Sequence, residues 1–212
     1  MNTLTVLLQQ IGMFVIYIIT GVILIRTKVL TRENLEIISK VVIKLSLPVM
    51  IFINIIDGVN KEILFGSCLI LLIAAGFYVV MFLVSLWMTK FFHLGENRAG
   101  IYQAMMLFGN IGFMAVPVIS NVFPGNGILY VSVFMIFDQF MLWTLGVKLT
   151  TPKGSGRFDP KKLINPATVA ILIGMILMLT EVRIPSLLDT GLRKIGATAS
   201  PLAMIYIGGI FA

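Results

Sequence analysis

Long apolar runs separated by short polar segments make up nearly the whole chain. A helix needs about 20 predominantly apolar residues to cross a lipid bilayer, and most of these runs reach or approach that length. They therefore predict about seven membrane-spanning helices. The predicted spans are residues 5–25, 37–56, 63–88, 99–123, 128–147 and 163–180, with a seventh that begins near residue 197.

The polar segments divide the chain into two unequal parts. Residues 149–162 form a linker with the Gly and Pro content of a loop. We expect residues 1–148 to form a five-helix unit and residues 163–212 to begin a second one. Residues 186–194 are amphipathic, and the apolar run that follows still continues at Ala212. Since a natural C-terminus rarely lies inside a span, we expect the chain to be truncated.

Composition places these helices in a membrane. Hydrophobic residues make up 58% of the chain and charged residues 12%, whereas soluble domains carry about 25% charged residues. The mean hydropathy is +1.03. A soluble fold of this size has too little interior for so much apolar surface, so the sequence predicts an all-α integral membrane protein.

The net charge of +7 follows the predicted membrane topology. Lys and Arg are concentrated in residues 26–36, 89–98 and 148–162, while the alternate loops hold little positive charge. Because positively charged loops stay in the cytoplasm, we expect these three loops to be cytoplasmic and the N-terminus to lie outside. Only the loop after residue 180 is discordant. The basic residues do not interleave with exposed aromatic residues, which argues against nucleic acid binding.

Two parts of the chain align without a gap when the sequence is shifted by 153 positions. Gly21 then meets Gly174, Thr27 meets Thr180, and Pro48 meets Pro201. Apolar segments can match by chance, but the aligned Gly, Thr and Pro residues favour a repeat. The shift covers five helices, an odd number, so the second unit would run in the opposite direction. Inverted repeats of this kind are common in secondary transporters, and a complete unit would contain five plus five helices.

The fourth predicted span contains helix-breaking residues in its middle. Gly109, Asn110, Gly112 and Pro117 lie within nine residues, with Ile111 between them. Gly weakens a helix, and Pro removes a backbone hydrogen bond. Such breaks can offer the N–H groups of a half-helix to an anion, and the Asn110 amide can add a donor. We therefore expect a carboxylate site here, with a simple packing kink as the alternative.

Three polar residues inside the other spans are candidates for ion binding. Asp138 and Gln139 lie in the fifth span, and a carboxylate at that depth costs roughly 3 kcal/mol on insertion scales. They are candidates for binding a coupling proton or sodium ion. The alternatives for Asp138 are pairing with a lysine such as Lys44, or a protonated, hydrogen-bonded state. Lys44 itself either extends to the membrane surface or attracts an anionic substrate.

Enzyme chemistry has little support in the sequence. The chain has no HExxH, GxSxG, GxxxxGK or CxxC motif, and only one His and one Cys. A multi-histidine metal or haem site is therefore excluded, and we expect no metal, no catalytic residue and no cofactor.

The motif GNIGFMAVPVI in the fourth span resembles the signature of the auxin efflux carrier family of permeases, which includes bacterial malonate and malate permeases. KLSLPVMIF in the second span, WTLG in the fifth and INPATVAILIGMIL in the sixth resemble that family less specifically. The resemblance implies ten helices in two inverted repeats, with a broken helix of each repeat crossing near the substrate. It also implies a scaffold from the first two helices of each repeat, a moving domain from the other three, and a bacterial plasma membrane location.

The sequence therefore predicts a secondary transporter that moves a mono- or dicarboxylate by alternating access. We expect coupling to a proton or sodium ion, and a homodimer is a candidate assembly. The alternatives are a non-transporting membrane module, a channel, or an inactive fragment of such a transporter. A channel is disfavoured because the spans contain no repeated ring of polar residues.

Overall fold

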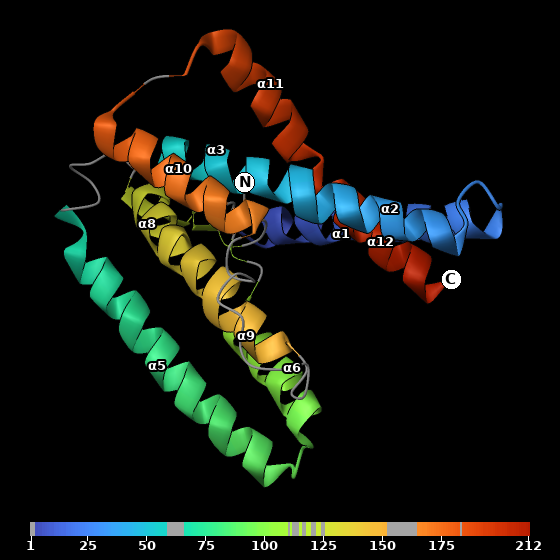
Figure 1. The fold of residues 1–212 in the computed structure, drawn as a ribbon, viewed down its shortest axis with the longest axis horizontal. Coiled ribbons are helices and arrows are strands. Elements are labelled where there is room, and N and C mark those ends of the chain that lie inside the picture. Colours follow the sequence, from blue (N-terminus) through green and yellow to red (C-terminus); the bar gives the residue numbers. More distant parts are fainter. Residues whose placement is uncertain are drawn as a thin grey trace.

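The computed structural model describes residues 3–58, 66–109, 111, 115, 118, 119, 122, 123, 126–151, 165–182 and 184–212, without the side chains of residues 3, 126, 128 and 129. Every regular element within this part of the chain is a helix (Figure 1). The predicted all-α class is therefore confirmed.

The first helices follow the apolar runs closely, with one local departure. Helix α1 covers Thr3–Arg26. The second run forms α2 (Arg32–Val41), a π-helical turn η1 (Val42–Ser46) and α3 (Leu47–Gly58). Pro48 is the second residue of α3, two positions after the end of η1, and Pro cannot donate to the carbonyl four residues earlier. The wider π turn accommodates that missing bond without ending the helix.

The remaining helices follow the later runs. Helix α5 covers Cys68–Phe91 and α6 covers Glu96–Leu107. The fifth run forms α8 (Asn126–Met141), a second π turn η3 (Leu142–Gly146) and α9 (Val147–Thr150). The last part of the chain forms α10 (Pro166–Thr180), α11 (Ser186–Ala197) and α12 (Ala199–Phe211).

Four segments of the described chain are long and apolar enough to cross a membrane: Leu4–Arg26, Cys68–Phe91, Tyr130–Thr150 and Ser186–Phe211. Helix α10 is a shorter apolar helix. The second and fourth predicted spans are not among these four segments. The second run forms α2, η1 and α3, and the helix of the fourth run, α6, ends early at Leu107. The amphipathic α11 continues almost directly into α12. These helices make the chain an all-helical integral membrane protein.

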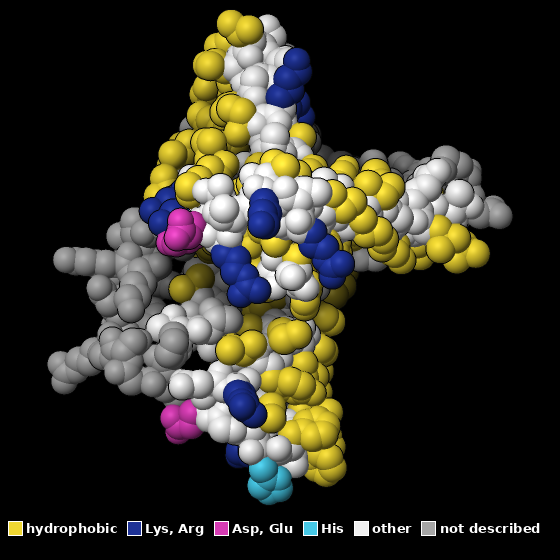
Figure 2. Space-filling view, turned by 90° about the vertical axis from the view of Figure 1, so that its right-hand side faces the viewer, with side chains coloured by type: hydrophobic (Ala, Val, Ile, Leu, Met, Phe, Trp, Pro, Cys, Tyr) yellow, Lys and Arg dark blue, Asp and Glu magenta, His cyan; other side chains and the backbone are white. Residues whose placement is uncertain are grey.

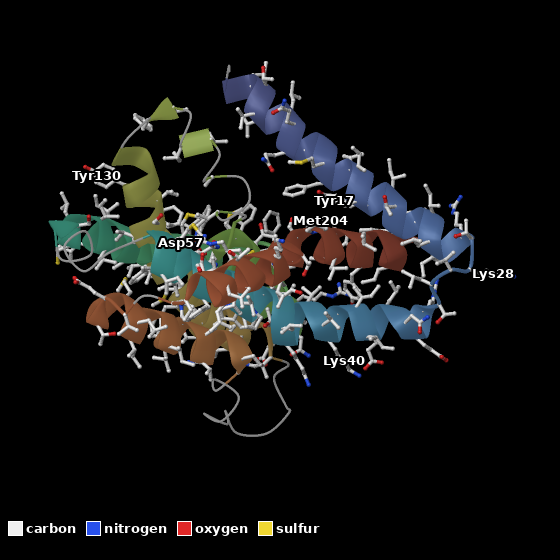
Figure 3. All side chains as sticks on the ribbon, turned by 90° about the horizontal axis from the view of Figure 1, so that it is seen from above. Tyr17, Lys28, Lys40, Asp57, Tyr130 and Met204 are labelled. Atoms are coloured by element: carbon white, nitrogen blue, oxygen red, sulfur yellow. The ribbon has the colours of Figure 1, made fainter. Side chains whose placement is uncertain are left out.

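Two helix pairs join residues 1–148 to residues 163–212, and we call this arrangement the reciprocal packing. Helix α1 packs against α12, and α3 packs against α10; Figure 3 shows α1 passing α12 with Tyr17 and Met204 labelled close to the contact. A buried cluster lies where α3, α8 and α10 meet. Helix α5 lies at the edge of the molecule and packs against α6 and α8 (Figure 1). The cluster consists of Ile51, Ile55, Val133, Ile136, Ala167, Ile171 and Met178.

Helices α1 and α10 end in the same way, at residues 153 positions apart. Lys28 and Glu181 both adopt the left-handed conformation, with φ of 59° and 55°. The preceding threonines also match: the Thr27 hydroxyl donates to the Ile23 carbonyl, and the Thr180 hydroxyl to the Ile176 carbonyl, each at 2.8 Å.

The contacts of these helices are also related by the 153-residue shift. A Cβ atom at Gly21 would overlap the Ile205 carbonyl oxygen, and a Cβ atom at Gly174 would contact Phe52 at 3.5 Å. Phe52 and Ile205 are themselves 153 positions apart. The contacts of Gly21 and Gly174 are therefore related by the same shift in the sequence.

Surface ion pairs follow the same relation. Lys40 Nζ lies 2.7 Å from Glu36 Oε1 on α2, and Arg193 Nε lies 2.8 Å from Asp189 Oδ2 on α11. The halves differ in burial, however. Leu35 on α2 is 5% exposed, whereas Leu188, its counterpart on α11, is 58% exposed. Helix α12 covers that face of α2, whereas α11 packs against α3 and leaves Leu188 uncovered.

Candidate functional site

Helix α6 stops in the middle of the fourth apolar run. Its last residue is Leu107, and Phe108 caps it in an extended conformation, with its N–H donating to the Ala104 carbonyl at 3.0 Å. Gly109 lies outside the helix and is exposed. The helix therefore ends immediately before the Gly, Asn and Pro motif that predicts a break.

The remaining residues of the predicted carboxylate site are only partly described. Ile111 is half-buried. Asn110, Gly112 and Pro117 lie outside the described residues. Their part in the site stays a prediction.

A buried polar contact fixes α6 against α5 just before the break. Gln103 is 8% exposed, and its Nε2 atom donates to the Thr89 hydroxyl at 3.3 Å. Helix α6 also meets α9 closely, since a Cβ atom at Gly100 would overlap the Leu149 carbonyl oxygen. Sequence reasoning missed Gln103, although an uncharged amide inside an apolar run is a visible signal.

Asp138 on α8 is 2% exposed, so its carboxylate faces protein rather than lipid. The Tyr78 hydroxyl on α5 donates to its Oδ1 atom, and Gln139 Nε2 lies 3.4 Å from its Oδ2 atom. Tyr78 is itself 4% exposed. The structure thus adds Tyr78 of α5 to the two predicted ion-binding residues. No pattern in the sequence pairs residues on facing helices.

Aromatic rings connect the Asp138 carboxylate to the break. The Tyr78 ring lies 5.7 Å from the rings of Phe108 and Phe137, centroid to centroid. The Phe108 ring also fits against Gly146 in η3, where a Cβ atom would lie 3.0 Å from Phe108 Cε2. Phe108 is the residue at which α6 ends. Phe108 therefore links the end of α6 to the Tyr78 ring, and the Tyr78 hydroxyl links that ring to the Asp138 carboxylate.

Lys44 lies apart from this cluster. It is exposed on η1, and the carboxylate of Asp138 accepts its hydrogen bonds from Tyr78 and Gln139. No ion pair joins Lys44 to Asp138 in the described part of the chain, so the pairing left open by the sequence does not form there.

An apolar cavity of about 550 Å³ lies between α5, α8 and α10. Its walls are side chains such as Leu71, Phe140 and Leu172. The Thr144 hydroxyl at its edge already donates to the Phe140 carbonyl at 2.6 Å. The cavity therefore offers almost nothing to stabilise a carboxylate, and the polar break and the Asp138 cluster are better candidates for a functional site.

Metal chemistry finds no support in the described residues, because no group of three or more His, Cys, Asp or Glu side chains there is placed to hold an ion.

Comparison with known proteins identifies the family. The sequence model of a family described as membrane transport protein matches residues 5–160 and 157–212. No curated protein sequence matches the chain. The family match covers nearly the whole chain and confirms the resemblance carried by residues 109–119. This is a family of transporters rather than enzymes. The chain therefore belongs to the auxin efflux carrier/membrane transport protein family, and the protein is a membrane transporter.

Proposed function

We propose that the protein is a secondary transporter that moves a small mono- or dicarboxylate across the membrane by alternating access. The observation that carries this proposal is the end of α6 at Leu107, inside an apolar run. Backbone groups freed at such a depth must be buried in protein or line a watery cavity. Half-helix N-termini in broken transporter helices bind anionic substrate groups, and the Asn110 amide is well suited to assist.

The reciprocal packing supports an inverted-repeat mechanism. In this proposal α1, α2–α3, α10 and α11–α12 form the scaffold, while α5, α6 and α8–α9 form the moving unit. The apolar cavity between α5, α8 and α10 lies at the boundary of the two units. A boundary with few directional hydrogen bonds allows one unit to slide against the other at low cost, because apolar contacts are non-directional.

We assign the coupling ion to Asp138. Its burial, and its hydrogen bond from Tyr78, support a site that takes up a proton or a sodium ion during transport. Intramembrane carboxylates commonly serve as proton relays. Asp138→Asn should then leave substrate binding intact but remove the response of transport to an imposed proton or sodium gradient. A gradient response equal to that of wild type would exclude Asp138 as the coupling residue.

Transport itself is tested with the full-length protein in proteoliposomes. Uptake of labelled mono- and dicarboxylates is measured under imposed proton, sodium and substrate gradients, with protein-free liposomes as the control. The proposal predicts saturable uptake of at least one small carboxylate. Well-folded protein that takes up none of them under any gradient, but exchanges a neutral or cationic solute, would contradict it.

A further inference from the structure

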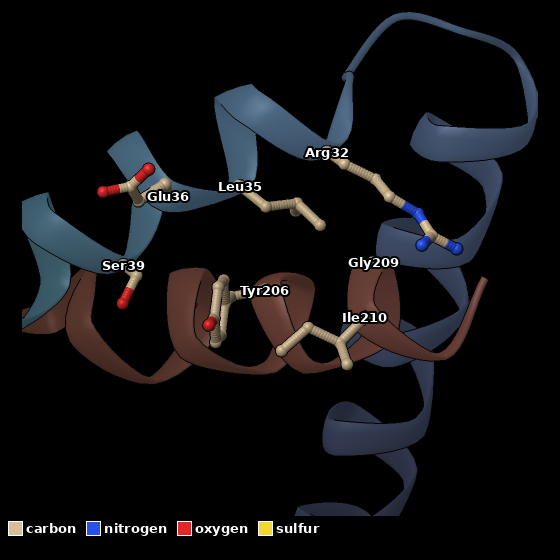
Figure 4. Close-up of a pocket in the computed structure, with 7 residues that line it drawn as sticks. All are labelled: Arg32, Leu35, Glu36, Ser39, Tyr206, Gly209 and Ile210. Atoms are coloured by element: carbon tan, nitrogen blue, oxygen red, sulfur yellow. The ribbon is translucent and has the colours of Figure 1, made fainter.

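A groove of about 280 Å³ lies between α2 and α12, away from the break and the Asp138 cluster. We propose that this groove binds an anionic phospholipid, with the phosphate at Arg32 and an acyl chain along its apolar wall. Figure 4 shows its lining from the two helices. Arg32, Leu35 and Ser39 line it from α2, and Tyr206, Gly209 and Ile210 line it from α12.

The floor of the groove depends on close packing of α12 against α2. A Cβ atom at Gly209 would lie 2.5 Å from Leu35 Cδ2, so a larger residue there would displace the end of this leucine side chain. Leu35 is consequently 5% exposed, while Ile210 beside it is 54% exposed. The groove therefore has an apolar wall that continues onto the outward face of α12, as an acyl chain requires.

The groove carries the positive charge of the Arg32 guanidinium. Among the described residues Arg32 forms no ion pair, and the carboxylate in the groove, Glu36, is already paired with Lys40 at 2.7 Å. Two more cations lie nearby in the sequence: Arg26 is the last residue of α1, and Lys28 lies in the turn between α1 and α2. Figure 2 shows the molecule from the right-hand side of Figure 1, and several Lys and Arg side chains lie on this face. The N-terminus of α2 adds its positive dipole end to this region.

Polar groups further along the groove match the rest of a phospholipid headgroup. Ser39 lies seven residues after Arg32, which is about 10 Å along an α-helix. The hydroxyl groups of Ser39 and Tyr206 have no hydrogen-bond partner among the residues that the structure describes. They are available to the ester carbonyls of a glycerophospholipid that lie deeper than its phosphate.

The position of the groove favours a lipid over a soluble anion. Gly209 packs against Ile25, the residue before the end of the candidate span Leu4–Arg26. The groove therefore lies at the level where α1 leaves the bilayer. Basic pockets between transmembrane helices at this level bind anionic lipid headgroups. A small soluble anion would not use the apolar wall.

Binding is tested on detergent-purified full-length protein by native mass spectrometry. Phosphatidylglycerol and phosphatidylcholine with identical acyl chains are compared, and free glycerol 3-phosphate is added as a competitor. We expect phosphatidylglycerol to bind preferentially. Arg32→Gln should weaken its binding by about tenfold or more, the effect of losing one charge-assisted hydrogen bond. Lys90→Gln, which removes a cation at the end of α5 outside the groove, should leave the binding unchanged.

Ile210→Ser tests the apolar wall with a substitution at an exposed position that folding tolerates. It should weaken binding of the lipid while leaving the preference for an anionic headgroup. Equal binding of the two lipids to wild type, or equal loss in Arg32→Gln and Lys90→Gln, would overturn the proposal. Competition by glycerol 3-phosphate as effective as that by the lipid would show a soluble-anion site instead, and would also overturn it. None of these outcomes depends on the transport activity.

Discussion

The contact between α1 and α12 makes a sharp prediction about two glycines of the same helix. Gly21 lies against the backbone of α12, where a Cβ atom would be 2.9 Å from the Ile205 carbonyl carbon and closer still to its oxygen. Gly12 has no atom within 4 Å of the equivalent position. Gly21→Ala should therefore destabilise the protein, while Gly12→Ala should not.

The size of the effect follows from what must move. The obstructing atoms at Gly21 belong to the backbone, which cannot rotate away as a flexible side chain can. Helix α1 would have to shift from α12 by roughly 1 Å in a closely packed interface. Overpacking of this kind costs typically about 1–3 kcal/mol, and we expect the upper half of that range. This is about a thirtyfold or larger change in the unfolding equilibrium.

Unfolding by SDS in mixed micelles, followed by circular dichroism, measures both variants on the same scale. Gly174→Ala, the counterpart in α10, should give a smaller loss, because its nearest neighbour is the side chain of Ile55 at 3.3 Å. If Gly21→Ala and Gly12→Ala prove equally stable, α1 and α12 do not approach as described. The reciprocal packing of the two parts of the chain would then lose its main support.

Three further predictions concern local structure and topology. Asn165→Ala removes the N-cap of α10 and should cost about 1 kcal/mol, seen as faster hydrogen exchange in the first turn of α10; unchanged exchange would refute it. Arg193→Ala breaks an ion pair with Asp57 in which the side chains are 45% and 38% exposed, so a double-mutant cycle should give a coupling energy of at most about 1 kcal/mol. An impermeant maleimide should label the native Cys68 in intact cells but not His93→Cys in a cysteine-free background, and the reverse pattern would invert the topology.

The helices themselves were predictable because long apolar runs dictate them. The break was also predictable, since Gly109 begins a cluster of residues that oppose a helix, and α6 ends at Leu107. The π turn at η1 was not, because Pro48 signals a disturbance without saying whether the helix kinks, widens or stops.

Contacts between helices were beyond the sequence. Tyr78 and Asp138 are 60 positions apart. An apolar run does not indicate which of its faces contacts another helix, or which residues of that helix it meets. The pairing of Gln103 with Thr89 was missed for the same reason. In a soluble protein the polar face of each helix would narrow the choice, but here lipid and protein present similar apolar surroundings on all sides.

The central claim is that the break after α6 binds a small organic anion, and binding to the full-length protein tests it most directly. Isothermal titration calorimetry in detergent compares wild type with Asn110→Ala, and with Asn34→Ala on α2 as the matched control. A lost charge-assisted hydrogen bond is worth about 1.5–3 kcal/mol, so Asn110→Ala should weaken carboxylate binding roughly ten- to a hundredfold. Asn34→Ala should bind as wild type does. Equal affinities in all three well-folded proteins would mean that Asn110 only packs, and that the break is a kink rather than the anion site.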